Sequence, residues 1–103
     1  MIIPISGAMN GTSNVFQTIG NLGYQFAGFI NGSAGSWGGA SIAIAITPNN
    51  SSIPITIGTL TQSSPIIPSY QLATGLFLQY TVTGATVGTS LNLFIAPLGV
   101  YGN

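Results

Sequence analysis

Apolar and polar residues alternate in short runs along this chain, and this alternation limits its fold more than any other feature. Isoleucine occupies every second position in 42–46 and again in 53–57, and residues 76–83 and 91–97 alternate in the same way. Successive side chains of a β-strand point to opposite faces, so a period of two predicts a strand with one buried face. Further strands are expected at 15–19, 22–30 and 70–72, which makes about seven in all.

Residues that favour turns separate these runs. Examples are Asn31-Gly32, Gly38-Gly39 and the Thr-Pro-Asn-Asn segment at 47–50, which fix a bend or tolerate a positive φ. No segment combines the apolar spacing of a helix with a cap and a stop. With 103 residues the chain is long enough for one domain. About seven short strands at intervals of about 8–12 residues predict an all-β fold, a single small β-sandwich or jelly-roll of antiparallel strands.

The first residues precede this strand pattern. Residues 1–14 are expected to form an N-terminal arm, and residues 15–103 the β-sandwich domain. The apolar residues of the arm are Ile2, Ile3, Ile5 and Met9. An apolar arm needs a surface that covers it, so we expect it to pack on a neighbouring subunit.

The chain contains no Lys, Arg, Asp, Glu or His, and it has no cysteine. Proton transfer, nucleophilic catalysis and metal binding near neutral pH depend on these side chains. Nucleic-acid binding depends on Lys and Arg, which neutralise the phosphate charge. We therefore expect no enzyme activity, no cofactor, no metal site, no nucleic-acid partner and no small-molecule substrate.

The apolar runs are also too short for a membrane-spanning helix, which needs about 18 consecutive apolar residues. The opening Met-Ile-Ile-Pro-Ile lacks the basic region and the cleavage site of a secretory signal. The expectation is a protein synthesised in a cytoplasm without export, and without a membrane partner.

Stability is expected to be nearly independent of pH between about pH 4 and pH 9. Apart from the chain termini, only four tyrosine phenols can ionise, and a phenol ordinarily does so near pH ~10. No side-chain carboxylate can lose a native partner as the pH falls, so the free energy of unfolding should change by less than about 1 kcal/mol across this range. Denaturant unfolding at several pH values measures this change, and a larger step would contradict the prediction.

Some aromatic residues are expected to lie outside the core. Phe29, Phe77 and Phe94 fall on the strand face opposite the main apolar residues, which predicts an outward apolar patch at an interface. Trp37 is either a plug at the edge of the core, which we favour, or a stacking platform for a sugar or a partner chain. The interface candidates are Ile2, Ile3, Ile5, Met9, Phe29, Trp37, Phe77 and Phe94.

Two segments carry a resemblance to a known class of protein. Phe-Ala-Gly-Phe-Ile at 26–30, followed by Gly-Ser-Trp-Gly-Gly-Ala at 35–40, a strand and the Thr-Pro-Asn turn at 47–49, resembles a pattern of small virion proteins of tailed bacteriophages. The segment 76–97, with Gly-Ala-Thr at 84–86, is similar to their closing hairpin. The resemblance implies a capsid decoration (cement) protein on the outer capsid surface. Its partners would be the major capsid protein and copies of itself, as a trimer.

Neutrality suits a subunit that is repeated many times on one particle. Like charges on many neighbouring copies would repel one another, whereas apolar and backbone contacts would not. Two other functions stay open. One is a filament subunit whose arm at 2–5 adds a strand to a neighbour's sheet. The other is a glycan-binding accessory domain that uses Trp37, the tyrosines, Gln79 and Asn92.

Overall fold

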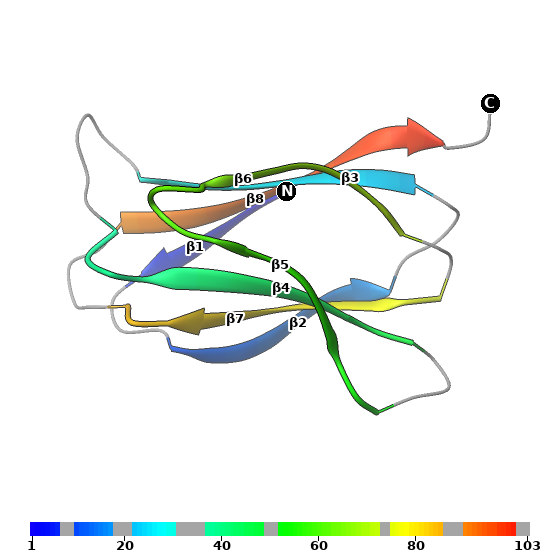
Figure 1. Cartoon of the computed structure of the whole chain (residues 1–103), viewed down its shortest axis with the longest axis horizontal. Coiled ribbons are helices and arrows are strands. Elements are labelled where there is room, and N and C mark those ends of the chain that lie inside the picture. The colour runs from blue at the N-terminus through cyan, green and yellow to red at the C-terminus, as the bar shows by residue number, and fades with distance from the viewer. Residues whose placement is uncertain are drawn as a thin grey trace.

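The computed structural model describes residues 1–6, 10–17, 22–30, 37–48, 52–72, 75–85 and 90–100. These residues form eight β-strands and no helix (Figure 1). The strands are β1 (Ile2–Ser6), β2 (Gly11–Gln17), β3 (Leu22–Ile30), β4 (Ser41–Thr47), β5 (Ile55–Leu60), β6 (Ile66–Leu72), β7 (Phe77–Thr83) and β8 (Ser90–Val100). The predicted all-β class is confirmed.

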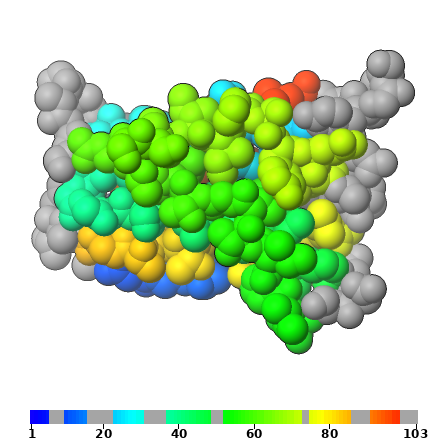
Figure 2. Space-filling model, viewed as in Figure 1, coloured from blue at the N-terminus to red at the C-terminus, as the bar shows by residue number. Residues whose placement is uncertain are grey.

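The strands form two four-stranded sheets in which all paired neighbours are antiparallel. One sheet has the order β1-β8-β3-β6, and the other has the order β2-β7-β4-β5. The pairing is nested along the chain, because β1 pairs with β8, β2 with β7, β3 with β6 and β4 with β5. Successive nested pairs alternate between the two sheets. The edge strands β5 and β6 both lie on the face of the molecule seen in Figure 2. They meet where the bridge between Thr61 and Ser64 closes the turn between them, and they diverge from there (Figure 1).

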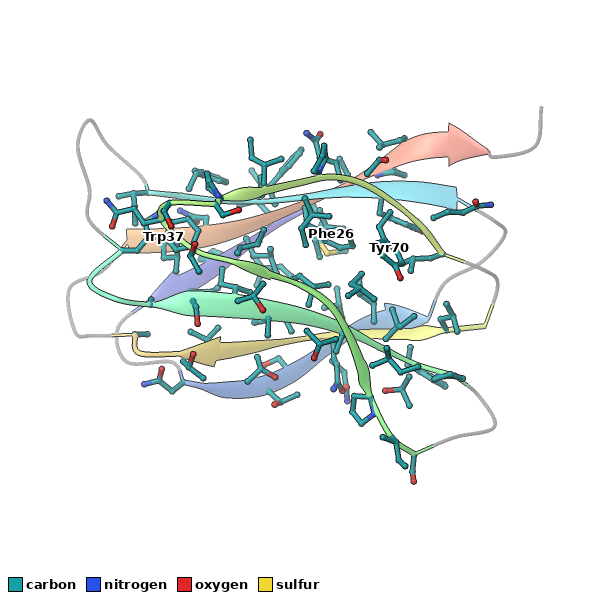
Figure 3. The ribbon with its side chains drawn as sticks, in the orientation of Figure 1. Phe26, Trp37 and Tyr70 are labelled. Carbon is teal, nitrogen blue, oxygen red and sulfur yellow. The ribbon has the colours of Figure 1, made fainter. Side chains whose placement is uncertain are left out.

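The core lies between the two sheets and is built from the alternating apolar residues. Phe26 and Leu93 from one sheet and Ile42, Ile44 and Leu78 from the other are all 1% exposed or less. Figure 3 shows Phe26 between the sheets, with Trp37 toward one end of the molecule. On β7 and on residues 41–44 of β4, buried and partly exposed residues alternate as predicted. Further along β4 the difference is lost, because Ala45 is buried too and Ile46 is only partly buried.

Trp37 closes one end of the core. Its side chain is buried, and its ring lies so close to Gly28 that a Cβ on Gly28 would come within 2.7 Å of Trp37 Cζ2. The backbone of Trp37 is also held, because its N–H donates to Gln62 Oε1 at 3.0 Å and its carbonyl accepts from the N–H of Ala40 at 3.0 Å. The favoured position of Trp37 in the core is therefore confirmed, and its use as an exposed stacking platform is wrong.

Most of the segment expected to be a separate arm belongs to the two sheets. β1 pairs with β8 from Ile2–Phe94 to Ser6–Ser90, and β2 pairs with β7. The amino terminus of Met1 donates to the carbonyl of Ile95 at 2.9 Å. The prediction that residues 1–14 form an arm apart from the β-sandwich is therefore wrong for the residues of β1 and β2. The residues of β1 and β2 lie within the sheets, since Ile5 completes the buried side of the first sheet.

The strand expected at 53–57 lies further along the chain. β5 begins at Ile55, while Ile53 is 72% exposed. The register between β4 and β5 shifts after Ile44, so the alternation of isoleucines does not report burial here. The strand expected at 70–72 is the end of the longer β6, and the one expected at 15–19 begins earlier, as β2.

Candidate functional site

The outer side of the β1-β8-β3-β6 sheet is mainly apolar. One row of register neighbours crosses all four strands and consists of Ile2, Phe94, Ala27 and Ile66. In the next row, Pro4 and Phe29 lie on either side of Asn92. Ile2 is 57% exposed and Ile66 is 51% exposed. We call Ile2, Pro4, Ala27, Phe29, Ile66 and Phe94 the apolar face.

Asn92 is the polar residue within the apolar face. It is buried, and its Nδ2 donates to the carbonyl of Phe29 at 3.5 Å. A buried amide that is hydrogen-bonded to the backbone supports the sheet rather than a ligand. The expectation that Asn92 contacts a glycan is therefore not supported by its position.

The outer side of the β2-β7-β4-β5 sheet is polar and uncharged. Thr12 Oγ1 and Thr81 Oγ1 share a hydrogen bond of 2.8 Å, and Ser41 Oγ and Thr83 Oγ1 share another of 2.8 Å. Both pairs join neighbouring strands at opposed positions in the register. The two outer sides of the molecule thus differ in chemistry, one apolar and one rich in hydroxyl groups.

The interface candidates divide among three places. Ile2, Phe29 and Phe94 belong to the apolar face, whereas Phe77 lies on the outer side of the other sheet and is 45% exposed. Ile5 and Trp37 are buried in the core, and Ile3 is partly buried against it, so none of these three is placed to meet a partner. The side-chain directions predicted for Phe29, Phe77 and Phe94 agree with the structure. Met9 lies outside the described residues.

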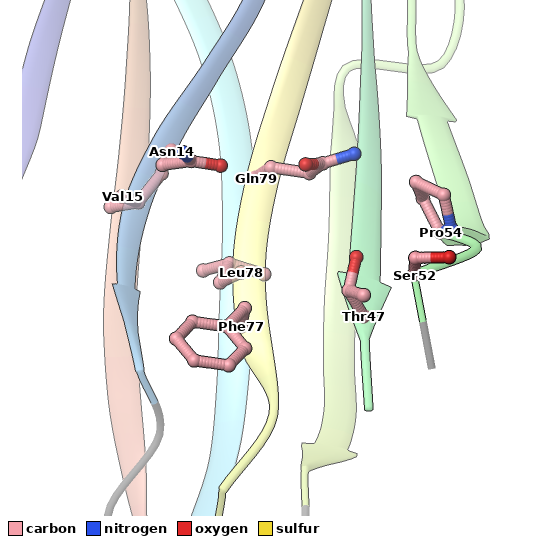
Figure 4. A pocket seen from close by; sticks show the side chains of 8 residues that line it. All are labelled: Asn14, Val15, Thr47, Ser52, Pro54, Phe77, Leu78 and Gln79. Atoms are coloured by element: carbon pink, nitrogen blue, oxygen red, sulfur yellow. The ribbon is translucent and has the colours of Figure 1, made fainter. Parts of the chain in front are cut away.

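A hollow of about 530 Å³ lies beside Phe77. Its lining residues are Asn14, Val15, Thr47, Ser52, Pro54, Phe77, Leu78 and Gln79. Figure 4 shows these side chains spread over β2, β7, β4 and the segment before β5. Asn14 and Gln79 are opposed in the register, and so are Phe77 and Thr47. The strand pairing therefore brings an exposed ring, two amides and a hydroxyl group together.

Two irregularities in the register flank this hollow. Val15 lies at the shift between Asn14 and Phe16 on β2, and a second shift follows Ile44 where β4 pairs with β5. Such bulges bend an edge strand and increase its twist. The segment before β5 projects from the body of the molecule, as Figure 2 shows, and its Ser52 and Pro54 form one wall of the hollow.

The hollow holds no ionisable side chain, so its chemistry is limited to hydrogen bonding and apolar contact. Its floor and walls have no group that could act as an acid, a base or an anionic metal ligand. The part of the chain that the structure describes also contains no helix long and apolar enough to span a membrane.

A second hollow, of about 570 Å³, lies at the opposite end of β4 and is lined by Trp37, Gly39, Ala40, Ser41, Thr61, Gln62 and Ser63. The Trp37 side chain that lines it is buried, and Gln62 is already hydrogen-bonded to the Trp37 backbone. The Trp37 ring packs in the core and the Gln62 amide is bonded within the chain. This hollow therefore offers fewer groups to a ligand than the one beside Phe77.

The sequence indicated only part of the first hollow. The alternation in β7 places Phe77 and Gln79 on one outward face, which the structure confirms. Asn14 and Thr47 were missed because their closeness depends on β2 and β4 lying on either side of β7. No local pattern in the sequence reports that pairing.

Comparison of the chain with protein-family models, with curated proteins and with solved structures gives no match.

Proposed function

We propose that this chain is a structural virion protein of the capsid decoration type, a small jelly-roll that binds the outer capsid lattice in many copies. The nested strand pairing is the observation that supports it most strongly. A jelly-roll is a double-sheet fold of eight strands, and viral capsid domains are among the proteins that use it. The pairs β1–β8, β2–β7, β3–β6 and β4–β5 alternate between two sheets in the manner of one long hairpin rolled into a sandwich.

The apolar face supports a role in assembly. A row of exposed and half-exposed apolar residues crosses all four strands of one sheet, and exposed apolar patches of this kind mark interaction sites. A charged partner would bury its own charges without a counter-charge from a side chain, because this protein has no charged side chain. The partner surface that fits is therefore uncharged where it meets this face.

The filament alternative loses its main support. That hypothesis needs the residues of β1 to be free for addition to a neighbour's sheet. In the structure these residues already pair with β8, and Pro4 within β1 has no N–H to offer a further strand. A subunit whose first strand is paired within its own sheet is more suited to packing side by side on a capsid shell than to exchanging strands with a neighbour.

The test is the occupancy of variant subunits on capsids that lack this chain. Ile66→Asp places a charge on the exposed edge of the apolar face and should reduce occupancy at least tenfold, since an unpaired charge at a closed interface costs more than about 1.4 kcal/mol. Thr59→Asp places the same charge on an exposed position of the other sheet and should leave occupancy unchanged.

Occupancy is counted by electron microscopy after incubation of each variant with the undecorated capsids. Circular dichroism confirms beforehand that both variants are folded. Equal loss of occupancy in the two variants would contradict the role of the apolar face. Absence of the wild-type chain from every capsid surface would contradict the proposed function itself.

A further inference from the structure

We propose that the hollow beside Phe77 binds a neutral saccharide. Its volume of about 530 Å³ lies within the range of about 300–1,000 Å³ that is typical of small-ligand sites. The site is on the sheet opposite to the apolar face, so it stays accessible when that face is covered. The proposal does not depend on the capsid function.

Phe77 supplies the apolar surface that one side of a sugar ring requires. It is 45% exposed although it belongs to a regular strand that is paired on both sides. The face of a pyranose that carries its C–H groups is apolar and flat, and an aromatic ring held on a strand offers a rigid surface against it. An exposed phenylalanine that is fixed in this way has no part in the core.

The amides of Gln79 and Asn14 lie close enough to Phe77 to reach the hydroxyl groups of a sugar that is stacked on its ring. Gln79 is two residues from Phe77 on one strand, so their side chains leave the same face about 6.6 Å apart. Asn14 lies opposite Gln79, and Thr47 lies opposite Phe77. A single sugar ring stacked on Phe77 would therefore reach the two amides and the hydroxyl group of Thr47 with its own hydroxyl groups.

The chemistry of these groups matches sugar hydroxyls. Each amide offers two N–H donors and a carbonyl acceptor, and a sugar hydroxyl both donates and accepts. Asn14 is exposed, and neither its amide nor that of Gln79 is hydrogen-bonded to another residue that the structure describes. These donors and acceptors are available to a ligand.

The absence of charge defines the class of saccharide. A sulfated or carboxylated sugar would bring a negative charge to a site with no Lys or Arg, and an amino sugar would bring a positive charge to a site with no carboxylate. Because either charge would go unpaired, neutral hexoses and their N-acetyl forms are the ligands that fit.

The experiment is an NMR titration of the full chain, labelled with ¹⁵N, against neutral oligosaccharides of glucose, mannose, galactose and N-acetylglucosamine. Each is raised to ~10 mM, which is tenfold above a dissociation constant of ~1 mM. At least one should give saturable shifts centred on Asn14, Phe77 and Gln79. Sulfated forms of the same sugars should bind more weakly.

Two variants distinguish binding at this site from nonspecific binding elsewhere on the protein surface. Phe77→Ala should weaken binding about tenfold or more, because a central aromatic contact dominates such sites. Phe29→Ala removes an exposed ring from the apolar face and should leave the affinity unchanged. Fluorescence of Trp37, the one tryptophan of the chain and a buried residue, shows whether each variant is folded. If Phe77→Ala is not folded, Gln79→Ala serves as the variant, with the same expected loss.

Three results would overturn the proposal. They are no saturable shift with any of the four neutral sugars, equal affinity of the wild type and the folded site variant, or preference for the sulfated sugars. None of these bears on capsid binding, which Ile66→Asp and Thr59→Asp test separately.

Discussion

Replacement of Ile44 by aspartate is expected to prevent folding near neutral pH. Ile44 is 1% exposed within the core, and no side chain of the protein carries a positive charge that could pair with the carboxylate. An unpaired buried charge costs several kcal/mol. Loss of the isoleucine side chain adds about 2–5 kcal/mol. The sum is comparable to the whole stability of a small domain, which is about 5–15 kcal/mol.

The same variant should show a pH dependence that the wild type lacks. Burial would raise the pKa of the new carboxyl group above its unfolded value of about 3.9. Any folded state would then bind the proton more tightly than the unfolded state, so stability should increase as the pH falls and reach its maximum below about pH 4. Circular dichroism at pH 7 and at lower pH values measures both effects.

Ser41→Asp is the matched control on the same strand. Ser41 lies on the outward face of β4, and its Oγ shares a hydrogen bond with Thr83 Oγ1. A carboxylate at position 41 can accept the same bond from Thr83, so this variant should fold and lose about 1 kcal/mol or less. If both variants unfolded alike, the assignment of the two faces of β4 would be wrong.

Alternation in the sequence predicts the strands that are buried on one face, because it reports burial directly. It identifies the inward residues of β4, β7 and β8, and β3 has the predicted bounds of Leu22–Ile30. It fails for β1, because residues 1–14 precede the alternating runs and were expected to form an arm that packs on a neighbouring subunit. The backbone pairing that holds β1 in the sheet is made with β8, which is nearly ninety residues away along the chain. No local sequence pattern can therefore report it.

The candidate site shows the same limit. The sequence places Phe77 and Gln79 together because they share a strand face, and it places Phe29 and Phe94 outside the core for the same reason. It does not show that Ile2 joins Phe94 in one row, or that Asn14 lies opposite Gln79. These relations arise from the nested pairing of strands, in which the partners closest in sequence are Ile46 and Ile55 and the most distant are Ile2 and Phe94.

Replacement of Gly28 by alanine is expected to destabilise the domain by about 3 kcal/mol, at the upper end of the range for an overpacked core. The new Cβ would meet the ring of Trp37, with Cζ2 at 2.7 Å. The ring cannot easily retreat, because it is buried and the Trp37 backbone is held by hydrogen bonds to Gln62 and Ala40. Denaturant unfolding, followed by circular dichroism, measures the loss.

A double-mutant cycle tests whether this contact is the cause. Trp37→Leu alone should be destabilising, because it leaves a cavity beside Gly28. In the Trp37→Leu background, Gly28→Ala should cost less than about 1 kcal/mol, which gives a coupling of about 2 kcal/mol between the two positions. Ala27→Ser, one residue away on the outer face, should have little effect in either background. A cost of Gly28→Ala that stayed the same without the tryptophan ring would mean that the backbone of β3, rather than the ring, requires glycine at this position.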